Sequence, residues 1–339
     1  MNKVGEQVNN INILGIETSC DETAAAIVEN GRNILSNIVN SQIDIHQEFG
    51  GVVPEIASRK HIENITLVVD AAFKQADMGY DDIDAVAITN APGLVGALLV
   101  GLSFAKGFAY ALEKPLIAVN HLHGHIYANF LVHDDIEFPA VCLIVSGGHT
   151  SILYMTEPGE YEMLGSTIDD AAGEAFDKVA RFLGLGYPGG PAMQKAAAAG
   201  EAGKYPLPRV FLNRKDLDFS FSGLKTAAMN QWKKNQQNTG IVNDLAAEFQ
   251  DTLAEILTVK TLRAAELKKA NTILLAGGVA ANSALRILLK KEGEARGLKV
   301  YYPPLSLCTD NAAMIAGSAY SRFLKGDFAA LDLNAFASL

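Results

Sequence analysis

The chain has 339 residues, which is too long for one typical hydrophobic core, so about two domains are expected. Hydrophobic residues make up 49% of the sequence and there are 30 glycines, a composition typical of a packed, loop-rich α/β enzyme and not of a disordered chain. The formal net charge of −10 argues against a self-sufficient nucleic-acid-binding protein, because such proteins usually carry a basic balance.

No apolar run reaches transmembrane length without a break, and residues 1–7 lack the apolar core of a signal peptide. The three cysteines, Cys20, Cys142 and Cys308, are too few and too scattered for a disulfide framework or a zinc knuckle. We therefore expect a reducing, cytoplasmic location and no membrane partner.

The first third of the chain predicts five strands and an apolar helix. Turn residues bound each apolar run, which is typical of strands. The expected strands lie at 11–16, 24–28, 34–39, 85–88 and 116–119, with a small polar loop at 17–23 and the helix at 94–112.

A histidine pair follows the last of these strands, in Asn120-His-Leu-His-Gly-His125. If a helix starts here, His121 and His125 lie on one face about one turn apart, and two neutral imidazoles at that spacing can hold one cation. His123 lies on the opposite face and is not expected to be a ligand. Histidines also occur as satisfied core or surface residues, so the spacing alone leaves both interpretations open. The glutamate of H-E-x-x-H is missing, and with it the general base of zinc proteases.

The second half of the chain repeats the pattern of the first. Strands are expected at 140–145, 151–154, 161–164, 272–276 and 300–302, with a loop at 146–150, a helix at 280–291 and a loop at 308–311 that opens the last helix. Strands alternating with helices in duplicate imply two similar α/β domains. The positions before the two final helices are then related by pseudo-symmetry, which places Asp310 opposite His121 and His125.

Residues 209–234 form a local basic segment with interleaved aromatic side chains. The cations are Arg209, Arg214, Lys215, Lys225, Lys233 and Lys234, against Asp216 and Asp218, and the aromatics are Phe211, Phe219, Phe221 and Trp232. A charged surface with some core aromatics is the ordinary interpretation. A part of a nucleic-acid-binding surface, with aromatics that stack on unpaired bases, is the alternative.

The duplicated order of strands and helices resembles the actin, Hsp70 and sugar-kinase superfamily. That resemblance implies an α/β fold of two pseudo-symmetric domains with a nucleotide cleft between them, and phosphate-binding loops at 17–23 and 146–150. We expect an N-terminal subdomain at 1–133, a C-terminal subdomain at 134–325 with a helical insertion at about 169–260, and a tail at 326–339.

A more specific resemblance rests on ten motifs in the expected order from about residue 11 to residue 325. They include Gly15-Ile-Glu-Thr-Ser-Cys-Asp-Glu-Thr23 and Val145-Ser-Gly-Gly-His-Thr150, and the others lie at 50–59, 92–96, 121–125, 169–178, 187–191, 219–225, 276–282 and 308–311. These motifs are similar to those of the TsaD family, the tRNA N(6)-adenosine threonylcarbamoyltransferases, in its bacterial branch. Ala312 stands where many members have glycine, which adds one methyl group.

The resemblance implies an acyl transfer from threonylcarbamoyl-adenylate to the exocyclic amine of the adenosine 3′ of the anticodon, in tRNAs reading codons that begin with A, with release of AMP. Two other activities are weighed against it. An ATP-dependent kinase or ATPase of the sugar-kinase superfamily would leave the histidine pair unexplained, and a metallopeptidase would lack its usual motif.

The resemblance also implies roles for individual residues. One divalent metal, iron(II) or else zinc or manganese, would be bound by His121, His125 and Asp310. The adenylate would be contacted by Ile144, Val145, Ser146, Gly147 and Gly148, its ribose by Asp177, its base pocket by Gly190, and its adenosine by Asn282 from the other domain. Glu17 and Lys178 are catalytic candidates without a defined role.

Simpler structural roles exist for several of these residues. Asp170, Glu174 and Asp177 fit the solvated face of a helix, Asp310 fits a helix N-cap, and Asn282 fits a helix's first turn. The partners that the resemblance implies are tRNA, a TsaB-like paralogue bound through the N-terminal domain, and a TsaE-like ATPase. Help from a partner surface suits an acidic chain that must bind tRNA.

Overall fold

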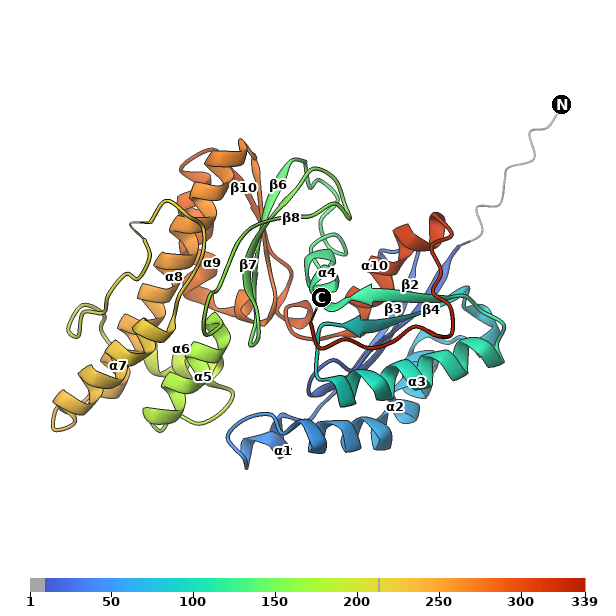
Figure 1. Cartoon of the computed structure of the whole chain (residues 1–339), viewed down its shortest axis with the longest axis horizontal. Coiled ribbons are helices and arrows are strands. Elements are labelled where there is room, and N and C mark those ends of the chain that lie inside the picture. Colours follow the sequence, from blue (N-terminus) through green and yellow to red (C-terminus); the bar gives the residue numbers. More distant parts are fainter. Residues whose placement is uncertain (1–9, 213, 339) are drawn as a thin grey trace. The chain divides into compact units, whose positions relative to one another are not determined.

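The computed structural model describes residues 10–212 and 214–338, which form two compact units (Figure 1). Within these ranges, unit 1 comprises residues 10–42, 54–127 and 311–338, and unit 2 comprises residues 43–53 and 128–310. Among the described residues, no helix combines the length and the apolar composition needed to cross a bilayer.

Unit 1 is a five-stranded sheet in the order β3-β2-β1-β4-β5. The first three strands are antiparallel, and β4 and β5 run parallel to β1. The strands are β1 (Asn12–Glu17), β2 (Glu22–Glu29), β3 (Asn33–Ser41), β4 (Ala85–Ala91) and β5 (Leu116–Asn120). The helices are α2 (Pro54–Ala76), α3 (Val95–Ala111), α4 (His121–Tyr127) and α10 (Ala312–Leu324), with a 3-10 turn, η1 (Tyr80–Asp82).

Helices cover both faces of this sheet, which explains why its central strands are apolar without alternation. Leu14 and Ile16 of β1 pack in one core with α2 and α3. The opposite face carries α10, which approaches β1 so closely that a Cβ on Gly15 would lie 2.4 Å from the carbonyl oxygen of Ala312. Only glycine fits there, and the close approach fixes α10 on unit 1.

Unit 2 repeats the same topology, with its sheet in the order β8-β7-β6-β9-β10. Again the first three strands are antiparallel and the last two run parallel to the first. The strands are β6 (Ala140–Val145), β7 (Thr150–Met155), β8 (Glu162–Ser166), β9 (Thr272–Ala276) and β10 (Lys299–Tyr301). The helices are α1 (Ile43–Gln47), α5 (Ala172–Phe182), α6 (Gly189–Ala197), α7 (Ser222–Asn235), α8 (Ile241–Lys268) and α9 (Ser283–Glu294), with 3-10 turns η2 (Gly278–Ala281) and η3 (Leu305–Leu307).

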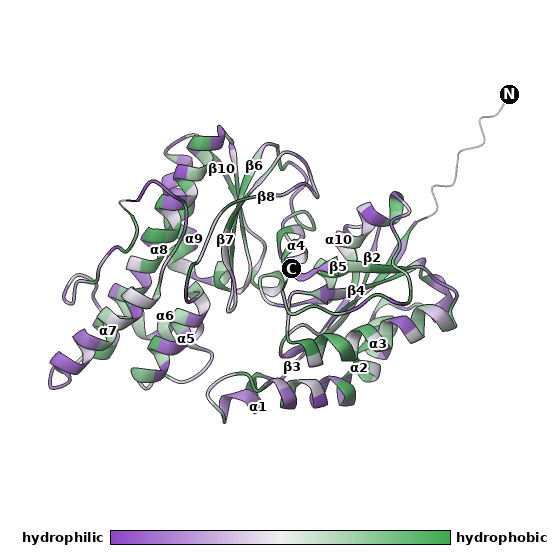
Figure 2. Cartoon of the chain, in the orientation of Figure 1, coloured by the Kyte–Doolittle hydropathy of each residue, from purple (hydrophilic) through white to green (hydrophobic). Residues whose placement is uncertain are grey.

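The predicted duplication is confirmed, because all ten expected strands occur and both sheets have one topology. The apolar helix predicted at 94–112 is α3. The helix predicted at 280–291 begins later, at Ser283, because residues 278–281 form the turn η2 and the Asn282 side chain accepts a hydrogen bond from the amide of Leu285, 3.0 Å away. Hydrophobic residues follow the buried strands and helix faces in both units (Figure 2).

The compact units differ from the ranges expected from the sequence. The order of elements along the chain predicts residues 311–325 in the second subdomain, because α10 follows β10. In the structure α10 belongs to unit 1, as does the tail after it, and the short segment 43–53 belongs to unit 2.

Candidate functional site

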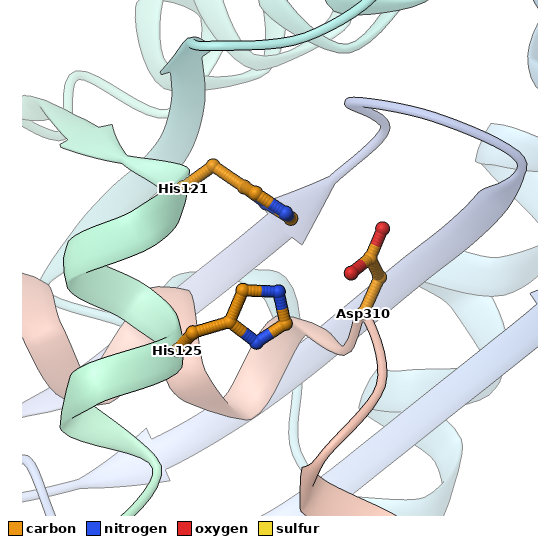
Figure 3. A group of neighbouring side chains, drawn as sticks. All are labelled: His121, His125 and Asp310. Carbon is orange, nitrogen blue, oxygen red and sulfur yellow. The ribbon is translucent and has the colours of Figure 1, made fainter. Parts of the chain in front are cut away.

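His121, His125 and Asp310 lie together, as the spacing and pseudo-symmetry predicted. Their potential ligand atoms all lie within 4.8 Å of one another, and the three side chains point toward a common centre (Figure 3). The two imidazoles come from successive turns of α4, with ring centroids 4.6 Å apart. Both histidines are buried and Asp310 is half-buried. The described residues hold no second cluster of this kind.

The orientation of His121 is fixed by the loop after β1. Its Nδ1 lies 3.0 Å from Oε2 of Glu17 and 3.1 Å from Oγ of Ser19. A carboxylate can only accept, so the proton of the neutral imidazole sits on Nδ1 and the lone pair on Nε2. A metal-binding histidine usually has this kind of partner, because it sets the tautomer that leaves the other nitrogen open for the ion.

Glu17 is fully buried, and both of its carboxylate oxygens accept hydrogen bonds. The amide of Ser19 donates to Oε1 over 2.5 Å and the hydroxyl of Thr89 donates to Oε2 over 2.6 Å. These bonds tie together β1, β4 and α4. The motif at 15–23 contains Glu17 and Ser19, but it does not indicate their contact with His121. Thr89 lies outside the motifs, 72 residues from Glu17.

The donor set fits a divalent metal. Two imidazoles and one carboxylate suit iron(II), zinc or manganese. Asp310 does not cap α10, because Asn311 does so by accepting from the amide of Met314 over 3.1 Å. The N-cap explanation for Asp310 is therefore wrong. Burial and, to a smaller degree, the nearby Arg322 charge lower the pKa of His123 to about 4, so His123 is neutral at pH 7 and lies outside the cluster.

The loop after β6 holds the residues expected at the adenylate phosphate. Ile144 and Val145 are fully buried at the end of the strand, so their side chains belong to the core. Ser146 closes the turn by accepting on Oγ from the amide of His149 over 3.1 Å. Gly147 and Gly148 are exposed, and a Cβ on either would meet no atom within 4 Å, so their backbone is open to a ligand.

Asp177, Gly190 and Asn282 all lie in unit 2. The prediction that Asp177 and Asn282 come from different domains is therefore wrong. Its cause is that α9, which Asn282 opens, follows β9 of the same sheet as β6. Two of the three also have structural roles. The Asp177 carboxylate accepts a hydrogen bond from the backbone amide of Gly189 over 2.7 Å, at the start of α6. The side-chain amide of Asn282 donates to Oε1 of Gln250 over 2.9 Å.

Lys178 is engaged in ion pairs within unit 2. Its Nζ lies 2.8 Å from Asp170 and 2.8 Å from Glu174, and the hydrogen bonds to these carboxylates raise the pKa of Lys178 above its usual range. Lys225 also pairs with Asp170. Only 14% of the Asp170 side chain is exposed, so the expectation of a solvated helix face is wrong for this residue.

Asp169, next to it, holds the segment that leads into α7. Its carboxylate accepts from the hydroxyls of Ser220 and Ser222 and from the amide of Phe221, over 2.5, 2.6 and 2.8 Å. Burial raises the pKa of Asp169, but these hydrogen bonds outweigh that effect and hold it below its usual range. The adjacent carboxylates of Asp169 and Asp170 thus anchor residues 220–225.

The basic segment 209–234 is more structural than its composition suggested. Phe219 and Phe221 are fully buried and stack on each other, so the idea that they stack on RNA bases is wrong. Arg209 pairs with Glu248 and Glu255, at 2.8 and 2.9 Å. Lys233 and Lys234, by contrast, are exposed in the last turn of α7, a helix coloured largely as hydrophilic in Figure 2.

Two sheets of one topology, each with helices around it, define a protein with the fold of the actin, Hsp70 and sugar-kinase class. Solved structures share this fold. Component A of the Acidaminococcus fermentans (R)-2-hydroxyglutaryl-CoA dehydratase has a TM-score of 0.56 at 15% identity, over 92% of this chain and 98% of that one. HypF of T. kodakarensis has a TM-score of 0.61 at 16% identity, over 96% of this chain and 49% of that one.

Within this class the chain belongs to the TsaD family, described as tRNA N6-adenosine threonylcarbamoyltransferase, which matches residues 33–317. The protein of that name from Syntrophomonas wolfei is 69% identical over 96% of this chain and 97% of its own length. The one from Moorella thermoacetica is 56% identical over 99% of both. The chain is accordingly an acyltransferase that acts on N6 of adenosine in tRNA.

Proposed function

We propose that the acyl donor is threonylcarbamoyl-adenylate and that the acceptor is the adenosine 3′ of the anticodon in tRNAs reading codons that begin with A. The exocyclic amine attacks the carbonyl carbon, a C–N bond forms, the C–O bond to phosphate breaks, and AMP leaves while N6 loses a proton. The donor is already an activated mixed anhydride, so the protein needs no nucleophile. Catalysis then rests on positioning and electrostatics.

We propose that His121, His125 and Asp310 hold one divalent metal, iron(II) or zinc. The clustering of these three donors is the observation that carries the proposal. Bound there, the ion would act as a Lewis acid toward an oxygen of the substrate. Glu17 accepts the hydrogen bond from Nδ1 of His121 and so leaves Nε2 of His121 available to the ion.

The open backbone of Gly147 and Gly148 supports a phosphate contact, because glycine amides without side chains admit an anion closely. Asp177 is proposed to take the ribose hydroxyls. Its carboxylate has about four acceptor sites, so the bond from Gly189 leaves capacity for them. Gly190 and Asn282 are proposed to line the adenosine pocket from the same unit.

Neither Glu17 nor Lys178 is proposed to be an acid or base. Glu17 is fully buried behind His121, and Lys178 is paired with two carboxylates. Both are better explained as positioning residues, the first for the metal ligand and the second for α5 against Asp170.

We propose that tRNA contacts the end of α7 and that protein partners complete the surface. The exposed Lys233 and Lys234 support the first point. Ile62, Leu67 and Leu99, on α2 and α3 of unit 1, are exposed apolar side chains, which supports a TsaB-like paralogue on this unit. A TsaE-like ATPase is proposed as a further partner, and the tRNA substrate implies a cytoplasmic location.

The test is a comparison of three reactions of the purified chain with its partners. Transfer of threonylcarbamoyl from the adenylate to tRNA is measured beside hydrolysis of ATP and of peptide. Transfer that is lost in His125→Ala supports the proposal. Hydrolysis of ATP or of peptide that depends on this chain, without transfer, would establish an ATPase or a peptidase activity instead.

A further inference from the structure

The segment 328–337, here called the strap, runs from the end of α10 back across the edge of the unit 1 sheet (Figure 1, dark red). The amide of Ala329 donates to the carbonyl of Leu116 on β5 over 2.8 Å, and Lys106 of α3 donates to the carbonyl of Leu333. Further on, the amide of Phe336 donates to the carbonyl of Asn90 on β4 over 2.9 Å. Backbone atoms of the strap thus contact three elements of unit 1.

The strap's last contact is with the loop that joins β4 to α3. The amide of Gly93 donates to the carbonyl of Ala337 over 3.3 Å. The same loop presses on Ser19, because a Cβ on Gly93 would lie 2.6 Å from the carbonyl oxygen of Ser19. The next amide, of Leu94, donates to that oxygen over 2.8 Å. The loop is therefore held between the strap and Ser19.

Ser19 in turn touches both the metal ligand and its partner. Its Oγ lies 3.1 Å from Nδ1 of His121, and its amide donates to Glu17 over 2.5 Å. A shift of the Ser19 backbone would move the two groups that orient His121. Hydrogen bonds thus connect Ala337 to Gly93, the adjacent Leu94 to Ser19, and Ser19 to His121.

We propose that the strap is a positioning element for the metal centre and acts on His121 through the 93–94 loop and Ser19. The inference rests on the proposed metal centre. The simpler role of the strap is to cover core, since Ala335 packs in the unit 1 core with Leu333 beside it. If the strap only covers the core, its disruption should lower the stability of the fold and leave metal binding unchanged. If it is a positioning element, its disruption should also change the affinity and the ligand geometry of the bound ion.

Cobalt(II) serves as the probe, because its visible absorption reports the ligand field and its titration gives a dissociation constant. Phe336→Pro removes the amide that bonds to Asn90, and Phe336→Ala is its matched control because it keeps that amide and truncates a half-exposed ring. Gly93→Ala forces the loop away from Ser19, and Gly107→Ala on α3 is its control because a Cβ there meets no atom within 4 Å. Thermal unfolding is recorded for all four variants.

We expect Phe336→Pro and Gly93→Ala to weaken cobalt binding roughly tenfold and to shift the absorption band, as losses around a metal ligand commonly do. Both controls should bind as the unsubstituted chain does. If either Phe336→Pro or Gly93→Ala melts earlier yet keeps the original affinity and spectrum, the strap is only a cover. Should Phe336→Pro fail to fold, a chain that ends at Ala335 replaces it, because that chain lacks both the Phe336 amide and the Ala337 carbonyl. A chain that binds no cobalt, or binds it equally after His125→Ala, refutes the metal centre itself and the strap's role with it.

Discussion

Replacing Glu17 by glutamine tests whether the buried carboxylate sets the tautomer of His121. The amide keeps the shape of the side chain but has one acceptor oxygen where the carboxylate has two. If the glutamine oxygen faces Thr89 and His121, the glutamine NH₂ takes the place of Oε1. It then lies about 2.5 Å from the backbone amide of Ser19, and two hydrogen-bond donors clash. With its NH₂ toward His121, Nδ1 must become an acceptor, so Nε2 takes the proton and loses its lone pair for the metal.

Either arrangement removes a charge-assisted hydrogen bond from a fully buried site. Such a bond contributes on the order of 1.5–3 kcal/mol of stability. Loss of a metal ligand's partner typically reduces metal affinity about 10- to 100-fold. We therefore expect the zinc dissociation constant of Glu17→Gln to rise by that factor, with a far-UV circular dichroism spectrum like that of the unsubstituted chain.

The assay is a competition titration of zinc against a chelator of known affinity. Glu29→Gln is the control, since it makes the same chemical change at the far end of β2, where the carboxylate accepts hydrogen bonds from the side-chain amides of Asn10 and Asn33. An unchanged zinc affinity in Glu17→Gln would refute the reasoning, because the tautomer of His121 would then not depend on Glu17.

Three other predictions concern the remaining parts of the site. His125→Ala should lose about one equivalent of metal in elemental analysis, and full retention would contradict the three-residue centre. Asp177→Ala should weaken AMP binding in calorimetry and, because it also removes the acceptor for Gly189, should cost about 1 kcal/mol of stability. Equal AMP affinity would show that only the structural role is real. The double variant Lys233→Glu and Lys234→Glu should raise the apparent KM for tRNA and flatten its salt dependence while adenylate binding is kept. Wild-type kinetics across a salt series would place the RNA contact elsewhere.

The strands were predictable because each apolar run is short, bounded by turn residues and repeated in the same order in both halves. The histidine pair was predictable because helical spacing is a local property. Asp310 was predictable because the repeat relates its position before the last helix of the second half to the histidines of the first half. The contact of Glu17 with His121 was not predictable, since 104 residues separate them and no local pattern records which strand end faces which helix.

Two errors have a common physical origin. In sequence, Phe219 and Phe221 are two aromatics in a basic segment, but Asp169 binds Ser220 and Ser222 and directs both rings into the core. Likewise the chain order predicts that α10 packs with the strand before it, whereas Gly15 allows it to pack on the other sheet. In both cases a long-range contact outweighs the neighbourhood in sequence.

The packing of α10 against β1 also has a consequence for the order in which the protein is completed on the ribosome. Roughly 300 residues separate Gly15 from Ala312, and at about 5–20 residues per second the ribosome needs about 15–60 s to make them. Most of unit 2 is contiguous in the chain and emerges whole before α10 does. During that interval the apolar face of the first sheet that α10 will cover stays without its helix. Nascent chains that stall before residue 312 should therefore be bound by chaperones through this face, and release should follow synthesis of α10.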